Sequence, residues 1–149
     1  MIRFAQKADM EALLEMCAEH AAYERSAFSP EGKREALSEA LFGQVPELFC
    51  LVAEAKGALI GYATYMRQYS TWDAEAYIYM DCLFLRASAR GKGLGPQFMD
   101  KIVEEGRKMG CSLIQWQTPD FNEGAIRFYR RIGGQSKTKE RFFLPIEPE

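Results

Sequence analysis

The residues of this chain with the clearest chemical potential form a glycine-rich loop, Arg90-Gly91-Lys92-Gly93-Leu94-Gly95. Glycine at alternate positions admits positive φ and leaves no Cβ in the way, so consecutive N–H groups can converge on an anion. A helical pattern follows the loop, and the free N–H groups and dipole of a helix N-terminus add to that attraction. We therefore expect a pyrophosphate site here, the alternative being an ordinary glycine-rich surface loop.

The loop matches neither of the two familiar nucleotide-binding motifs. Its spacing is Gly-x-Gly-x-Gly, so the dinucleotide motif Gly-x-Gly-x-x-Gly fails by one residue, and the loop lies mid-chain instead of after the first strand. The Gly-Lys-Ser/Thr ending of a P-loop is also missing. The pattern therefore indicates a cofactor other than those of Rossmann or NTPase proteins.

Composition limits the classes of protein to consider. The chain has 149 residues, which predicts one domain over 1–149. Its net charge of −2 provides no broad basic field for a nucleic acid. No apolar run approaches eighteen residues and the first residues do not resemble a signal peptide. We expect a soluble, cytoplasmic protein without a nucleic-acid or membrane partner.

Cysteine and histidine usage argues against a metal site. The four cysteines, Cys17, Cys50, Cys82 and Cys111, lie far apart within apolar patterns, which is typical of buried free thiols. No Cys-x-x-Cys spacing occurs, and the single histidine, His20, has no residue of ligand type beside it. A Cys–His nucleophile pair stays open on these grounds.

Hydrophobic periodicity predicts the elements that position the loop. The predicted strands are 2–5, 48–54, 58–66, 77–85, 113–118 and a last one near 141–144, with a hairpin at 55–57. The predicted helices start at Asp9, at Ser29-Pro30, at Pro96 and at Asn122, and the last two end at Gly110 and Gly133. This order predicts a mixed α/β sheet with helices on both faces.

With these elements in place, the chain resembles the GNAT superfamily of acetyl-CoA-dependent N-acetyltransferases over nearly its whole length. The family signature Arg/Gln-x-x-Gly-x-Gly/Ala is met by Arg90, Gly93 and Gly95. The motifs that resemble the spermidine/spermine (diamine) and thialysine branch are Tyr23-Glu24, Tyr69-Ser70-Thr71-Trp72, Tyr79 to Leu85, Gly110-Cys111, and Asn122 to Tyr129 with Gly133. The resemblance implies a largely antiparallel sheet of six or seven strands with a splay between the two central strands, and a homodimer.

The resemblance implies acetyl-CoA as co-substrate and no metal. The coenzyme would lie where strands 77–85 and 113–118 splay, and an N–H of strand 77–85 would point at the thioester oxygen. The residues implied in coenzyme binding are Leu83, Phe84, Leu85, Arg90, Gly91, Lys92, Gly93, Leu94, Gly95, Pro96, Asn122, Ala125 and Tyr129. Pro96 has no N–H, so we expect a modest loss of affinity, with five donors left from Gly91 to Gly95.

Acetyl transfer to an amine requires a neutral nitrogen, which costs about 4–5 kcal/mol at pH 7 for a lysine-like amine. Asp81 is expected to contact the amine and accept its proton, directly or through one water, because a carboxylate in an apolar strand calls for a reason. In the resemblance it replaces the Glu of Tyr-x-Glu-Asp, and Cys82 replaces the Asp. The alternative places Asp81 on the solvent side of the strand.

Tyr129 is the second catalytic candidate. The resemblance implies that it protonates the departing CoA thiolate, a contribution of typically 10²–10⁴-fold. Without the resemblance, Phe128 and Tyr129 would be read as a pair of aromatic core residues.

A site for a cationic acceptor should combine carboxylates with aromatic faces. Tyr23 and Glu24 match a polyamine-contacting pair of the branch, and Trp72 and Trp116 could supply aromatic walls. Glu140 aligns with a substrate carboxylate only across a gap. The alternatives are a solvated helix end for Glu24 and core or dimer packing for the tryptophans.

The sequence therefore predicts an N-acetyltransferase that moves an acetyl group from acetyl-CoA to a primary amine of a small cationic or amino-acid-like acceptor, by direct attack in a ternary complex. Acetylation of protein N-termini or lysines is the alternative activity. A non-catalytic acetyl-CoA sensor and a structural domain that binds no CoA are the alternatives from other classes.

Overall fold

The computed structural model describes all 149 residues and divides into two compact units, Met1–Pro119 and Asp120–Glu149, which are described separately. The helices and strands of the first unit are β1 (Ile2–Phe4), α1 (Met10–Tyr23), α2 (Lys33–Phe42), β2 (Phe49–Ala55), β3 (Ala58–Ser70), β4 (Glu75–Leu85), α3 (Leu94–Lys108) and β5 (Ile114–Gln115), with 3-10 turns at Lys7–Asp9 and Ala87–Ala89. The second unit contains α4 (Glu123–Arg131). No helix has the length and apolar character needed to span a bilayer.

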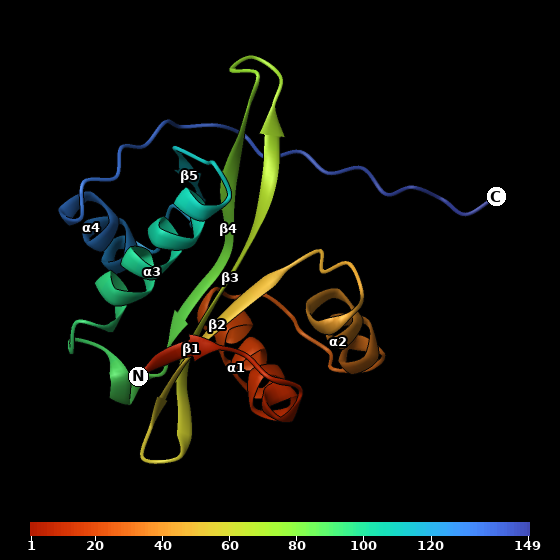
Figure 1. Ribbon diagram of the computed structural model, residues 1–149, viewed down its shortest axis with the longest axis vertical. Coiled ribbons are helices and arrows are strands. Elements are labelled where there is room, and N and C mark those ends of the chain that lie inside the picture. Colours follow the sequence, from red (N-terminus) through yellow and green to blue (C-terminus); the bar gives the residue numbers. More distant parts are fainter. The chain divides into compact units, whose positions relative to one another are not determined.

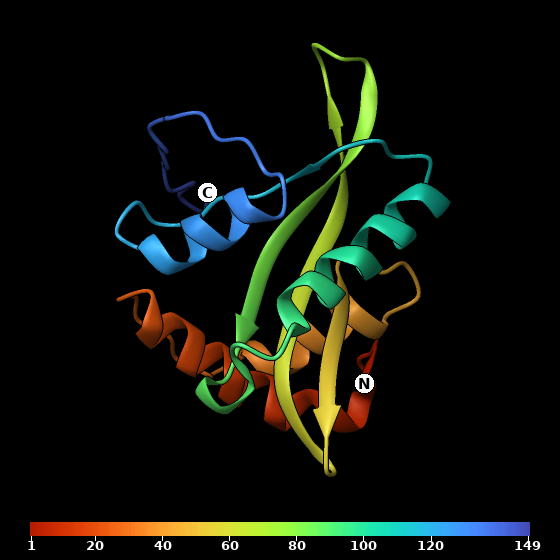
Figure 2. The same cartoon turned by 90° about the vertical axis from the view of Figure 1, so that its left-hand side faces the viewer.

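The sheet has five strands in the order β1-β2-β3-β4-β5 (Figure 1). The pairings from β1 to β4 are antiparallel, whereas β4 and β5 pair in parallel. A parallel pair needs a crossover, and α3 supplies it. Helices α1 and α2 cover one face of the sheet and α3 covers the other (Figures 1 and 2). The predicted mixed, largely antiparallel sheet with helices on both faces is confirmed.

The predicted count of six or seven strands is wrong. Residues 134–149 contain no strand, and the expected strand near 141–144 leaves Phe142 and Phe143 more than four-fifths exposed. A strand requires a partner for its backbone groups, and Pro145 and Pro148, which lack N–H donors, limit a ladder in this segment.

The core on the α1 and α2 face is built from alternate strand residues and one stripe of each helix. Its buried members are Met10, Leu13, Met16, Leu41, Cys50, Val52, Leu59, Tyr62 and Phe84. On the other face α3 approaches closely, because a Cβ at Gly106 would lie 3.1 Å from Cγ1 of Ile78. The middle of the sheet is therefore held from both sides.

The hairpin between β2 and β3 is confirmed as a two-residue turn in which Lys56 and Gly57 have φ of 53° and 76°. The hairpin between β3 and β4 is longer than predicted. Residues 67–70 and 75–76 extend the two strands, and the hairpin projects beyond the rest of the first unit (Figure 1). Cross-strand pairing from Arg67 to Ser70 accounts for the extension, although few of these residues are apolar.

Two predicted helix starts differ in the structure. Asp9 does not cap α1: its Oδ2 accepts the N–H of Gln6 at 2.7 Å, and helical turns begin at Lys7. The second helix begins at Lys33 instead of Pro30, because Gly32 with φ of 71° forms the turn before it.

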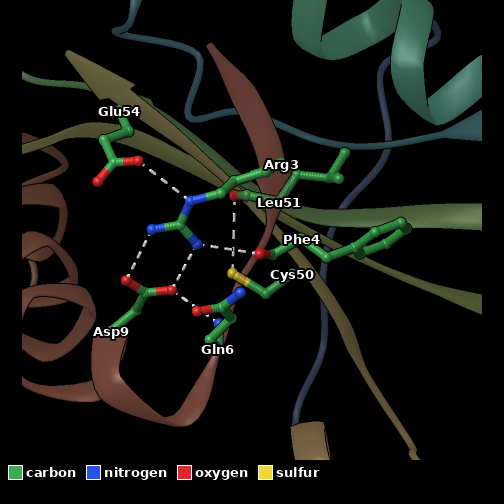
Figure 3. Close-up of polar contacts among 7 residues, drawn as sticks. All are labelled: Arg3, Phe4, Gln6, Asp9, Cys50, Leu51 and Glu54. Carbon is green, nitrogen blue, oxygen red and sulfur yellow. Dashed lines mark hydrogen bonds and ion pairs between the residues drawn. The ribbon is translucent and has the colours of Figure 1, made fainter.

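An ion-pair network joins the first strand to its neighbours (Figure 3). The guanidinium of Arg3 donates to both oxygens of Asp9 at 2.8 and 3.0 Å and to Glu54 at 3.3 Å. These bonds lower the pKa of the Asp9 carboxyl, with the Arg3 hydrogen bonds as the main cause. The network thereby ties β1 to the start of α1 and to the end of β2.

We predict that Asp9→Asn destabilises the fold at pH 7 by about 1.5–3 kcal/mol, the value of a hydrogen bond to a charged group. The folded pKa of Asp9 lies below its ordinary value, so its stabilisation is present above that value and is lost as pH falls through the folded pKa. Urea unfolding between pH 2 and 7 should therefore show a shallower acid loss in Asp9→Asn than in the wild type. The exposed Asp100→Asn serves as control, and equal acid profiles for both variants would refute the assignment.

Candidate active site

Strands β4 and β5 separate after a short parallel contact. The pairing joins Ile78 to Ile114 and Tyr79 to Gln115, and β5 offers no partner to the rest of β4. Strand β3 continues to pair with β4 as far as Leu85. One edge of β4 therefore stays open from Met80 to Leu85. Arg86 N donates to Ile60 O of β3, so by the alternation of an antiparallel pair the backbone groups of Leu83 and Leu85 face this open edge, whereas those of Phe84 face β3. The expected splay is at the predicted strands, but β5 is an edge strand here and not a central one.

A β-bulge lies at the start of this open edge. Thr64 pairs with Cys82 and Tyr65 pairs with Met80, so Asp81 is an extra residue of β4. A bulge re-aims side chains, and here Cys82 Sγ lies 3.8 Å from Asp81 Oδ2, so both side chains lie on one side of the strand. The Asp81 side chain is exposed, in agreement with the solvent-side alternative, and it stands beside the open edge.

The glycine loop presents unpaired donors. Gly91 and Gly93 have φ of 75° and 79°, and a Cβ at either would meet no atom within 4 Å. The backbone N–H groups from Gly91 to Gly95 have no acceptor within the chain. Helix α3 begins at Leu94, so Pro96 falls in its first turn, where a proline removes no intrahelical bond. The loop can thus receive an anion with five donors.

Arg90 connects the loop to β4 and α1. Its Nε donates to the carbonyl oxygen of Leu85 at 3.0 Å. Its guanidinium carbon lies 4.6 Å from the ring centroid of Tyr23 and 5.8 Å from that of Phe84. Tyr23 and three of the residues predicted for coenzyme binding therefore come together at the open end of β4.

Glu24 is held by His20, for which the sequence did not predict a role in the acceptor site. His20 Nε2 lies 2.7 Å from Glu24 Oε2, and His20 Nδ1 lies 2.7 Å from Tyr62 Oη. The His20 ring also stacks on Phe84 at 5.1 Å. The i,i+4 spacing of His20 and Glu24 on a predicted helix was the available signal. The pairing with Tyr62 depends on the fold.

The thiols near the site are protonated at neutral pH. Burial, with a smaller contribution from Asp81, raises the pKa of Cys82 to about 12. Burial also raises the pKa values of Cys17 and Cys50. All four cysteines are free, and no group of three or more His, Cys, Asp or Glu side chains is arranged to hold a metal ion.

The predicted residues of the second unit lie on α4. Asn122 is the N-cap, and its Oδ1 accepts the N–H of Ala125 at 3.4 Å. The rings of Phe128 and Tyr129 lie 5.2 Å apart, and both residues are half-buried. Gly133 follows the helix with φ of 100°, as predicted for its C-terminal end.

The remaining predicted acceptor residues are Trp72, Trp116 and Glu140. Trp72 is 98% exposed in the loop of the β3–β4 hairpin. Asp81 lies six residue steps along β4 from Glu75, roughly 20 Å at 3.3 Å per residue, so Trp72 does not reach Asp81 in this chain. Trp116 follows β5 and is half-buried, and Glu140 is exposed within 134–149.

The comparison with known proteins decides the family. Residues 10–134 match the Acetyltransferase (GNAT) family. This chain belongs to the GNAT family. It is 32% identical over 147 residues to the thialysine N-epsilon-acetyltransferase of Bos taurus, covering 93% of this chain and 86% of that protein. It is 24% identical to the human spermidine/spermine N(1)-acetyltransferase-like protein 1, covering 93% of this chain and 21% of that protein.

A solved structure has the same fold. The structure of AAC(6')-Iy in complex with the bisubstrate analogue CoA-S-monomethyl-acetylneamine superposes with a TM-score of 0.81 at 19% identity, covering 98% of this chain and 97% of that chain. Members of the GNAT family use acetyl-CoA as co-substrate. The chain is therefore an acetyl-transferring enzyme, and the resemblance inferred from its motifs is confirmed.

We predict that Cys82 reacts slowly with iodoacetamide at pH 8, because only the thiolate attacks and a pKa of about 12 leaves it scarce. Labelling should accelerate as pH rises toward 12. Peptide mapping by mass spectrometry after timed labelling measures the rate, with a small free thiol as reference. Labelling of Cys82 at pH 8 as fast as the reference would contradict the assignment.

Proposed function

We propose that this GNAT enzyme transfers the acetyl group of acetyl-CoA to a primary amine of a small cationic or amino-acid-like acceptor, by direct attack in a ternary complex. The observation that carries the proposal is the open edge of β4, which ends only a few residues before a loop with five unpaired N–H groups. One segment of chain thus offers backbone partners for an extended amide-bearing ligand and for its phosphates.

Acetyl-CoA, the acetyl donor, would use both the open edge of β4 and the glycine loop. The backbone of Leu83 and Leu85 would pair with the pantetheine and direct an N–H at the thioester oxygen. The loop from Gly91 to Gly95 would bind the pyrophosphate, aided by the N-terminus of α3. Arg90 Nε already donates to the Leu85 carbonyl oxygen, so a coenzyme that used this oxygen would share it with Arg90 or displace the Arg90 side chain.

We predict that Gly93→Ala lowers affinity for acetyl-CoA about tenfold or more, since the new Cβ would stand in the open space where the phosphate binds. Gly57→Ala is the matched control, because Gly57 has nearly the same φ and an equally open surrounding in the β2–β3 turn. Both variants should lose a similar roughly 1–2 kcal/mol of stability from left-handed strain. Calorimetric titration with acetyl-CoA should separate them, and equal affinities would count against the loop as the pyrophosphate site.

The chemical step needs a base for the amine and an acid for the departing thiolate. Asp81 is the proposed base, since the bulge places its exposed carboxylate at the start of the open edge. Acting directly or through one water, it would take the proton from the ammonium. Tyr129 on α4 is the proposed acid. The protonated state of Cys82 supports direct attack over an acetyl-cysteine intermediate.

We predict that Tyr129→Phe lowers kcat about 10²–10⁴-fold, the usual contribution of general acid–base catalysis, while acetyl-CoA affinity stays within about twofold of the wild type. Asp81→Asn should lower kcat over the same range. Tyr69→Phe and Asp100→Asn are exposed matched controls. Initial rates of thiol release measure kcat, and a Tyr129→Phe enzyme with normal turnover would remove that residue from catalysis.

The acceptor class is argued from charge. Glu24 and Asp81 supply two carboxylates, of which that of Glu24 is partly exposed and that of Asp81 is exposed. Carboxylates suit an ammonium group better than an anionic substrate. Similarity to a thialysine acetyltransferase and to a spermidine/spermine acetyltransferase-like protein supports the same class.

A thiol-release assay over polyamines, lysine, thialysine, amino sugars and peptides tests the acceptor class. The proposal expects turnover with small cationic amines in preference to peptides. Turnover of long peptides alone would establish the alternative, acetylation of protein N-termini or lysines. Binding of acetyl-CoA without turnover of any amine would establish a sensor.

A further inference from the structure

Two hydrogen bonds connect Glu24, His20 and Tyr62, and the donor in each can be assigned. An ionised carboxylate only accepts hydrogen bonds, so His20 Nε2 carries the hydrogen that meets Glu24 Oε2. In the neutral ring Nδ1 then accepts from the hydroxyl of Tyr62. Burial raises the pKa of Tyr62, which keeps that hydroxyl protonated. A protonated ring would donate from both nitrogens, so the bond to Glu24 exists in either state.

The imidazole is fixed by the sheet beneath it. Its ring stacks on Phe84 with an interplanar angle of 21°. Tyr62, only 2% exposed, lies directly opposite Phe84 in the pairing of β3 with β4. His20 is therefore anchored to β3 through Tyr62 and to β4 through Phe84. Its Nε2 atom remains for the hydrogen bond to Glu24.

The backbone of Glu24 is fixed as well. Helix α1 ends in a Schellman motif, in which Ser26 N donates to Ala21 O at 2.8 Å and Arg25 N donates to Ala22 O at 3.1 Å. Arg25 holds φ of 59°, a conformation that non-glycine residues disfavour and that persists where surrounding structure imposes it. The turn that carries Glu24 is thus held at both its backbone and its side chain.

Only one oxygen of the Glu24 carboxylate is used in this chain. Oε2 meets His20, whereas Oε1 has no partner, and the side chain is 32% exposed. The ring of Tyr23 beside it lies under the Arg90 guanidinium, whose carbon is 4.6 Å from the ring centroid. The group that this corner presents to an ammonium ion is therefore the free anionic oxygen of Glu24.

We propose that His20 is a positioning residue that holds the Glu24 carboxylate for the distal ammonium of the acceptor, an inference that rests on the proposed function. Glu24 binds the second cation of a diamine, and His20, itself braced by Tyr62, fixes the direction of its free oxygen. The pair then selects acceptors with two cationic groups over those with one.

A double-mutant cycle with two matched acceptors tests this role. The acceptors are a linear α,ω-diamine and the n-alkyl monoamine of the same chain length, and the variants are His20→Phe, His20→Gln, Glu24→Gln and His20→Phe with Glu24→Gln. His20→Phe should raise KM for the diamine about tenfold, the size expected for one charged hydrogen bond. Its kcat and its KM for the monoamine and for acetyl-CoA should stay within about twofold of the wild type.

Two further results distinguish positioning from a structural role. In the Glu24→Gln background, His20→Phe should add nothing to the diamine KM, because its effect passes through Glu24. His20→Gln, which keeps a donor, should recover part of the affinity. Unfolding midpoints report whether His20→Phe is folded, and His20→Gln carries the test if it is not.

The possible results distinguish a failure of the positioning role of His20 from a failure of the proposed acetyltransferase activity. Equal rises in KM for diamine and monoamine, additive effects in the cycle, or an unchanged diamine KM would overturn the positioning role while leaving the acetyltransferase intact. A wild-type enzyme that acetylates neither amine overturns the proposed function and this inference with it.

Discussion

The parting of β4 from β5 is the constraint on which the rest of the site depends. Buried or partly buried backbone groups need partners, and β5 supplies them only at Ile78 and Tyr79. Beyond that contact β4 is paired on one side alone, while α1 packs beneath it and the glycine loop follows its end. Both the open edge of β4 and the glycine loop have backbone groups without a hydrogen-bond partner in the chain. Such groups can bind a ligand built of amides and phosphates.

The turn that carries Glu24, the proposed acceptor-binding residue, is held by side chains of the sheet. Tyr62 and Phe84 are partners in the pairing of β3 with β4. Tyr62 hydrogen-bonds His20 and Phe84 stacks on its ring, near the end of α1. The carboxylate of Glu24 is thereby tied to the same strand whose far edge is open. Under the proposed function, the binding of the donor and the choice of the acceptor would both depend on β4.

Much of this fold could be predicted from residue pattern, because local rules decide it. The Lys56-Gly57 turn and the end of α4 at Gly133 were each marked by glycine and by the change of hydrophobic period. What could not be predicted depends on long-range pairing. The bulge at Asp81 is a one-residue shift in the pairing of β4 with β3. The sequence of β4 alone does not reveal such a shift. The hydrogen bond of His20 with Tyr62 likewise joins residues forty-two positions apart in the sequence. The expected strand near 141–144 failed because a strand-like pattern does not supply a partner.

Amide hydrogen–deuterium exchange with and without saturating acetyl-CoA tests the central claim most directly, because it reports on the backbone groups that define the site. We predict that the coenzyme slows exchange at Leu83 and Leu85 and at Gly91 to Gly95, while the amides of the β2–β3 turn are unchanged. Coenzyme binding that protects other segments and leaves these two unaffected would contradict it.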